Sequence, residues 1–152
     1  MPGIVSLDEA ALGPFKTLSA DATLLSASYL NGSNKIFKGP HRRDGVANPT
    51  LHMRLFDAGI EGDQDVTFNW LLRLSLYLDA STDYDVNMKR AGLIEIRIAE
   101  LLNGKVLTMA SGVTHLNCRL AGSGVALPVD TSTSARREHQ FAFSYYLSMG
   151  KQ

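Results

Sequence analysis

The fold of this chain is decided by residues 66–104, which read VTFNWLLRLSLYLDASTDYDVNMKRAGLIEIRIAELLNG. Four leucines occupy every second position from residue 72 to residue 78, and Arg73, Ser75, Tyr77 and Asp79 alternate with them. A period of two places the four leucines on one face of a β-strand. The sequence therefore predicts one long strand whose apolar face needs a cover.

A long helix, Asp85–Asn103, is predicted to supply that cover. Thr82 and Asp85 have the spacing of a capping box at its start, and Asn103-Gly104 is a suitable stop. The apolar side chains that recur at helical spacing are Ala91, Ile94, Ile98, Leu101 and Leu102. The leucine face and this apolar stripe are expected to pack together.

A strand is the alternative for residues 93–99. Ile94, Ile96 and Ile98 alternate with charged residues, and Gly92 weakens a helix by roughly 1 kcal/mol. We favour the helix, because the periodic segment is long and carries start and stop signals at its two ends.

The composition is that of an ordinary folded protein. The chain has 152 residues, 45% hydrophobic and 20% charged, which predicts one domain over residues 1–152. The formal net charge of zero argues against a protein whose whole surface binds nucleic acid. Cys118 is the only cysteine, and no apolar run approaches the roughly 20 residues of a membrane span. We expect a soluble protein made in a reducing cytoplasm.

The remaining elements are a helical N-terminal segment and three strands. Ser6 and Glu9 have capping-box spacing, but Gly13-Pro14 is expected to end that helix early, and a second helical start is expected after Ser19. Alternation predicts strands over residues 50–56, 113–120 and 139–149. The expected fold class is therefore α+β: an antiparallel-rich sheet of four or more strands covered by one long helix, with a short helical N-terminal segment.

Within the strand at residues 113–120, Cys118 shares one predicted face with Leu116 and Leu120, opposite His115, Asn117 and Arg119. Cys118 is therefore interpreted as a small core residue and not as a nucleophile. No histidine lies in a zinc-binding motif, and no serine lies in a GxSxG motif. We expect no enzymatic activity, no cofactor and no metal.

Two charged segments have opposite sign. The first, residues 35–48, has only Asp44 against the bases Lys35, Lys38, Arg42 and Arg43. It is either a solvated loop or a docking surface for an acidic partner or a phosphate backbone. The second, residues 57–65, is read as a protruding loop and holds Asp57, Glu61, Asp63 and Asp65 without a base. It lacks the ligand order and terminal glutamate of a calcium loop.

The order of these pieces resembles a family of phage proteins. The pieces are FKTLSADATLLSASYL, then WLLRLSLYLDAS and a helix, then LLNGKVLTMASGVTHLNCRL, and finally RREHQFAFSYYL. This order is similar to that of the tail-terminator or tail-completion proteins of long-tailed bacteriophages, the ring-forming neck proteins that cap the tail tube. The resemblance covers nearly the whole chain, and residues 35–65 depart from it by being longer and more charged.

The resemblance implies a structural protein that forms a ring, with six copies the expected number, and joins tail to head. Its implied partners are other copies of itself, the tail tube protein and the head–tail connector proteins, with DNA passing through the lumen without specific binding and no membrane. Its implied location is the virion neck, with assembly in the host cytoplasm. Charge balance between the two segments suits head-to-tail contacts. The expected interface residues are Lys35, Lys38, Arg42, Arg43, Asp57, Glu61, Asp63, Asp65, Arg136 and Arg137.

Two other functions stay open from the sequence. A head–tail connector or stopper protein would differ from a tail terminator in its partner more than in its chemistry. A small nucleic-acid-binding module would use the basic segment, although Phe37 is its only aromatic residue available for stacking on bases.

Overall fold

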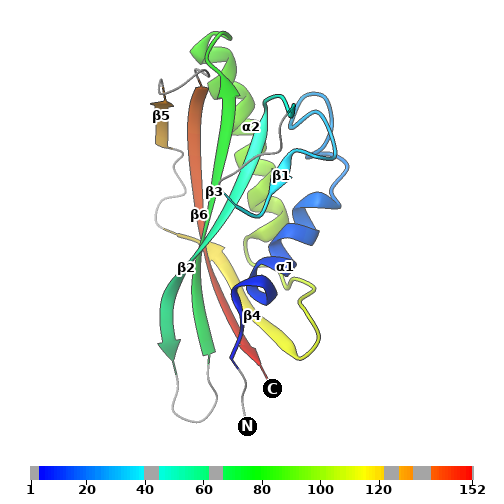
Figure 1. Ribbon diagram of the computed structural model, residues 1–152, viewed down its shortest axis with the longest axis vertical. Coiled ribbons are helices and arrows are strands. Elements are labelled where there is room, and N and C mark those ends of the chain that lie inside the picture. The colour runs from blue at the N-terminus through cyan, green and yellow to red at the C-terminus, as the bar shows by residue number, and fades with distance from the viewer. Residues whose placement is uncertain (1–3, 40–44, 62–66, 122–126, 132–137, 152) are drawn as a thin grey trace.

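A computed structural model describes residues 4–39, 45–61, 67–121, 127–131 and 138–151. Two helices and a curled sheet make up this part of the chain (Figure 1). The helices are α1 (Leu7–Ser19) and α2 (Tyr84–Leu102). The strands are β1 (Ile36–Phe37), β2 (Thr50–Glu61), β3 (Thr67–Asp79), β4 (Val113–Leu120), β5 (Leu127–Thr131) and β6 (Glu138–Lys151).

The six-stranded sheet has the order β1-β2-β3-β6-β4, and β5 also pairs with β6. The pairs β2–β3, β3–β6, β4–β6 and β5–β6 are antiparallel, whereas the two-residue β1 runs parallel to β2. β3 therefore lies near the middle of the sheet, with β2 on one side and β6 on the other. The long strand predicted from the alternating leucines is confirmed.

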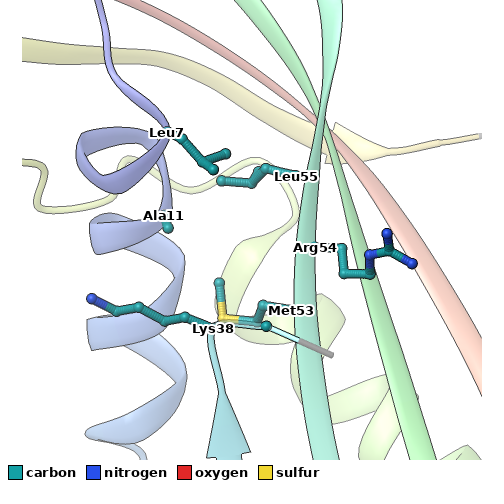
Figure 2. A pocket seen from close by; sticks show the side chains of 7 residues that line it. Leu7, Ala11, Lys38, Met53, Arg54 and Leu55 are labelled. Atoms are coloured by element: carbon teal, nitrogen blue, oxygen red, sulfur yellow. The ribbon is translucent and has the colours of Figure 1, made fainter. Parts of the chain in front are cut away.

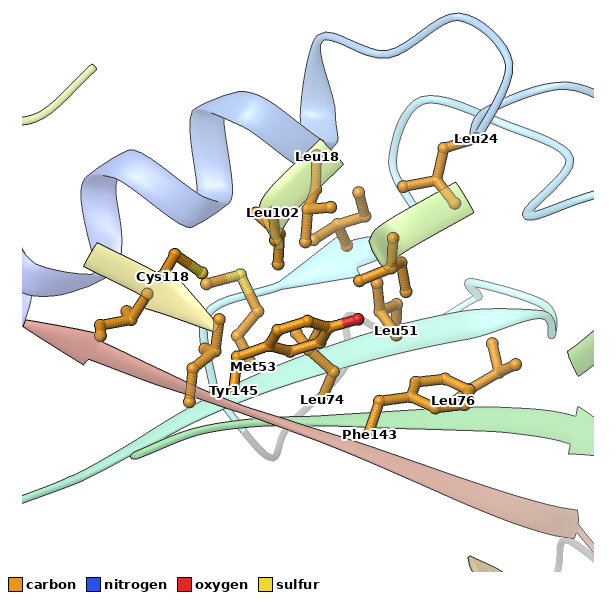
Figure 3. Packing of buried hydrophobic residues seen from close by; sticks show 14 of the residues in the cluster. Leu18, Leu24, Leu51, Met53, Leu74, Leu76, Leu102, Cys118, Phe143 and Tyr145 are labelled. Atoms are coloured by element: carbon orange, nitrogen blue, oxygen red, sulfur yellow. The ribbon is translucent and has the colours of Figure 1, made fainter. Parts of the chain in front are cut away.

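The core lies between the sheet and the two helices (Figure 3). The four alternating leucines of β3 are all buried, as are the matching residues of β6 from Phe141 to Leu147. From α2 the core receives Ala91, Ile94, Ile98 and Leu102. Residues 93–99 are therefore helical, and the strand alternative is wrong.

The expected fold class is wrong in two respects. The sheet is mixed, and two helices instead of one cover it, with both α1 and α2 contributing to the same core. The reason is width: neighbouring strands lie about 4.8 Å apart, so five strands span roughly 19 Å, whereas a helix is about 10 Å across. α2 packs over β3, β6 and β4, and α1 covers the β1–β2 side (Figure 1).

The expected early end of the first helix is also wrong, because α1 continues through Pro14. A proline normally forces the preceding residue out of helical conformation, since its ring clashes with that residue's Cβ. Gly13 has no Cβ, and a Cβ built there would lie 2.2 Å from Met109 Sδ. Glycine thus permits both the proline and the close contact with the segment after α2.

The expected second helix after Ser19 is replaced by a series of turns that α2 holds in place. Arg97 binds Asp21 through two hydrogen bonds, of 2.9 Å from Nε and 2.6 Å from a terminal nitrogen. Arg90 donates to the carbonyls of Tyr29 and Ala27. The hydrogen bonds from Arg97 lower the pKa of the Asp21 carboxyl. Leu24 and Leu30 are buried beneath these turns.

The predicted capping box at the start of α2 is not formed. Asp83 is the N-cap and makes no side-chain hydrogen bond to the helix. Asn87, one turn further on, is buried and bonds the Asp79 carbonyl and His139 Nδ1. A buried amide therefore positions the start of α2 against the ends of β3 and β6.

Two strand details differ from the sequence prediction. β2 continues to Glu61, so residues 57–61 are strand and not loop, and residues 62–66 lie outside the described residues. In β4 the register shifts between His115 and Asn117. A bulge of this kind reverses the alternation, so His115 is buried on the same side as Cys118, contrary to the prediction.

Two glycines near α2 give a test of this backbone. Gly92 lies within the helix, and a Cβ built there meets no atom within 4 Å, so Gly92→Ala should raise the free energy of unfolding by about 0.5–1 kcal/mol. Gly104 has a φ of +70°, which alanine adopts only with strain, so Gly104→Ala should lower the free energy of unfolding. Urea unfolding measures both changes, and a destabilising Gly92→Ala would contradict the helix placement.

Candidate functional site

Cys118 is a core residue, as predicted. Its side chain is fully buried, and burial raises the pKa of the thiol to about 12. A thiol must ionise to act as a nucleophile, so this one is inert at neutral pH. In the part of the chain that the structure describes, no helix is long and apolar enough to cross a membrane.

The described lysines of the basic segment already have partners inside the chain. Lys35 is 8% exposed, and its ammonium donates to the Ala47 carbonyl. The Lys38 ammonium lies 3.8 Å from an Asp8 carboxylate oxygen and 4.9 Å from the centre of the Phe15 ring. Lys35 therefore fixes the backbone beside β1, while Lys38 remains half-exposed next to α1.

The side chains of the other expected interface residues lie outside the part of the chain that the structure describes. Arg42, Arg43, Asp63, Asp65, Arg136 and Arg137 lie outside the described residues. Asp57 and Glu61 lie on β2, but the structure does not describe their side chains. Their role in subunit or partner contacts stays a prediction.

A cavity of about 250 Å³ opens between the first half of α1 and β2 (Figure 2). Met53 and Leu55 point into it from β2, and Leu7 and Ala11 face them from α1, while Arg54 points to the other side of the strand. Among the described residues that line the cavity, the charged ones are Lys38 and Arg54, and the Arg54 side chain points away from it. An apolar hollow with one lysine offers a place for a side chain of another molecule.

The strand beside this cavity has an open edge. β1 pairs only with Leu51 and His52, so among the described residues β2 has a strand partner on one side only from Met53 to Glu61. Unpaired strand edges readily pair with another chain. The cavity and the open edge together form one candidate contact surface.

A second candidate surface is the outward side of α2, which we call the α2 stripe and define as Val86, Leu93 and Ile96. All three side chains are about half exposed or more, at 54%, 47% and 61%. Val86 and Leu93 are seven positions apart and Ile96 follows three later, so they lie along one side of the helix. The sequence carries a signal for this stripe, since these three apolar residues do not fit the spacing of the buried residues of α2.

His115 is a buried polar residue that sequence analysis placed on the wrong face. Its Nδ1 accepts a hydrogen bond of 3.1 Å from the Leu107 backbone N–H, so the neutral ring carries its proton on Nε2. Nε2 is buried and has no hydrogen-bond partner among the described residues. Burial lowers the pKa of His115 from its ordinary value of 6.5.

This arrangement predicts a pH dependence of stability. Because the folded-state pKa lies below the unfolded one, the unfolded chain binds more protons, and stability should decrease as the pH falls below about 6.5. One such group contributes a slope of at most about 1.4 kcal/mol per pH unit. His115→Asn keeps an acceptor for Leu107 N–H and should flatten this slope. Equal slopes for both proteins in urea unfolding from neutral to mildly acidic pH would contradict this account.

Comparison with known proteins finds a match in structure but none in sequence. No protein-family model matches the chain, and no curated protein sequence matches it. A solved structure entitled "Virion of native gene transfer agent (GTA) particle" contains a chain with a TM-score of 0.68 and 12% sequence identity. The match covers 96% of this chain and 99% of that chain. This protein therefore shares its fold, from end to end, with a protein chain of a virion particle.

Proposed function

We propose that this protein is a structural component of a phage-like virion, and that it forms the ring that terminates the tail tube and joins it to the head. The observation that carries the proposal is the end-to-end match with a chain of a gene transfer agent virion. The resemblance of the sequence to tail-terminator proteins supports the position in the neck.

Ring formation needs two different surfaces on each copy, because a closed head-to-tail ring uses heterologous contacts. The described residues offer two such surfaces. One is the α2 stripe, which leaves three apolar side chains in solvent. The other is the open edge of β2 with its neighbouring cavity. They lie on different elements, on the helical layer and at the edge of the sheet (Figure 1).

The α2 stripe gives the first test of assembly. Leu93→Lys with Ile96→Lys places two charges in a contact that should exclude water, so ring formation should be lost while the monomer stays folded. Light scattering after size-exclusion chromatography and negative-stain microscopy measure the oligomer. Val106→Lys, at a side chain that is 82% exposed in the loop after α2, is the matched control.

The proposal is contradicted if the wild-type protein stays monomeric both alone and with purified tail tubes of the virion that carries it. Rings that bind the portal side of the head and ignore tail tubes would instead identify a connector or stopper. Rings formed equally well by the double variant would remove the α2 stripe from the interface but keep the proposed function.

The two charged segments give a separate test. We propose that they face different neighbours in the ring, so Glu61→Lys with Asp63→Lys should weaken assembly and tail capping without unfolding the monomer. A single exposed ion pair contributes only about 0–1 kcal/mol, but the contact repeats around a ring. High salt should weaken wild-type assembly in the same direction. Unchanged assembly of this variant at low and high salt would leave the acidic segment as solvated surface.

A further inference from the structure

The face of the sheet that no helix covers carries three arginines. Arg54 of β2 and Arg73 of β3 lie directly opposite each other, both exposed. Arg119 of β4 is exposed on the same face, paired with Tyr146 of β6. Figure 2 shows Arg54 on the side of β2 opposite to α1. We call this the arginine surface and define it as Arg54, Phe56, Arg73, Arg119 and Tyr146.

The structure describes no acidic partner for these arginines. Among the residues whose side chains the structure describes, no carboxylate lies within 4 Å of any of the three guanidinium groups. The neighbouring positions on the same face carry no carboxylate: Leu71, Ser75 and Ser144 lie beside Arg73, His52 lies beside Arg54, and Asn117 lies beside Arg119. Like charges opposite each other in a sheet destabilise it. The pair Arg54–Arg73 therefore lowers the stability of the isolated chain, and an anion from outside would relieve that cost.

Two aromatic rings hold the outer arginines in place. The Arg54 guanidinium carbon lies 5.4 Å from the centre of the Phe56 ring, and that of Arg119 lies 5.6 Å from the Tyr146 ring. Both distances are in the range of cation–π contacts. Both rings are 40% exposed, so the arginines are stacked over them without being buried. Stacking restricts the side chains and leaves their N–H groups available to an acceptor.

The spacing of the charges favours a polyanion. From β2 to β4 the arginines span three strand separations, or about 14 Å. One carboxylate cannot reach all of them, whereas duplex DNA carries one negative charge per roughly 1.7 Å of axis. Asparagine and serine side chains, which also bond phosphate oxygens, lie beside the arginines. We propose that the arginine surface binds the phosphate backbone of double-stranded DNA, weakly and without sequence preference.

This inference goes beyond the proposed ring, because it concerns a face of the single chain. In the proposed ring, the helix-free face of the sheet would then face the DNA. The proposed DNA contact does not include the basic segment, residues 35–48.

The test compares two triple variants that remove the same charge. Arg54→Gln/Arg73→Gln/Arg119→Gln neutralises the arginine surface, and Lys16→Gln/Lys89→Gln/Lys105→Gln removes three exposed lysines from α1, α2 and the loop after α2. Fluorescence anisotropy with a short labelled duplex is measured from about 50 to 200 mM salt. The wild type and the lysine variant should bind, with dissociation constants on the order of 1–100 µM.

The arginine variant should bind DNA at least about tenfold more weakly than the wild type. Its slope of log affinity against log salt should also be smaller in magnitude by up to about 3, because each lost phosphate contact removes roughly 0.9 from the slope. Its melting temperature should be unchanged or higher, because the repulsion between Arg54 and Arg73 is gone. Leu93→Gln/Ile96→Gln, which alters the α2 stripe without adding charge, should keep the arginine-dependent binding of DNA, so failure of the ring and failure of this surface are distinguishable.

Four results would overturn the proposal. The first is a wild type that does not bind the duplex at low salt, and the second is an equal loss of binding in the two triple variants. The third is tighter binding of polyglutamate than of DNA, with the same dependence on the arginines, which would identify an acidic protein as the partner. A large drop in melting temperature of the arginine variant would likewise assign these residues to the fold.

Discussion

Burial of the leucine face of β3 is the interaction on which the rest of the structure depends. Leu72, Leu74, Leu76 and Leu78 are all removed from water, and burial of each leucine contributes roughly 1.5–3 kcal/mol. β3 has a long strand on each side, so its leucines lie in the middle of the core. α2 can cover only part of a sheet this wide, and α1 is needed for the remainder. Because both helices lie on the same face of the sheet, the opposite face has no helical cover.

A sheet covered on one face has two surfaces of different chemistry. The covered face is apolar and closed, and it holds one inert cysteine and one neutral histidine. The other face exposes three arginines, and they have no carboxylate within 4 Å among the residues whose side chains the structure describes. The proposed function, contact between copies and with a charged polymer, would use the surfaces that this division leaves exposed.

Much of this arrangement was predictable from local sequence patterns. The strands β3, β4 and β6 and the helix α2 follow from periods of two and 3.6, which a single stretch of sequence displays. The continuation of α1 through Pro14 was not predictable, because it depends on Gly13 packing against Met109. The same holds for His115, whose face is set by a bulge. Alternation in the sequence placed Arg73 and Arg119 on polar strand faces, but only the strand order and register bring them together with Arg54.

The most direct test of the central claim is single-particle cryo-electron microscopy of the virion that carries this protein. We predict one closed ring of copies at the head-proximal end of the tail tube, with the α2 stripe buried between neighbours and the helix-free face of the sheet toward the DNA. Copies repeated along the whole tube, or a ring in which both surfaces remain in solvent, would contradict this account.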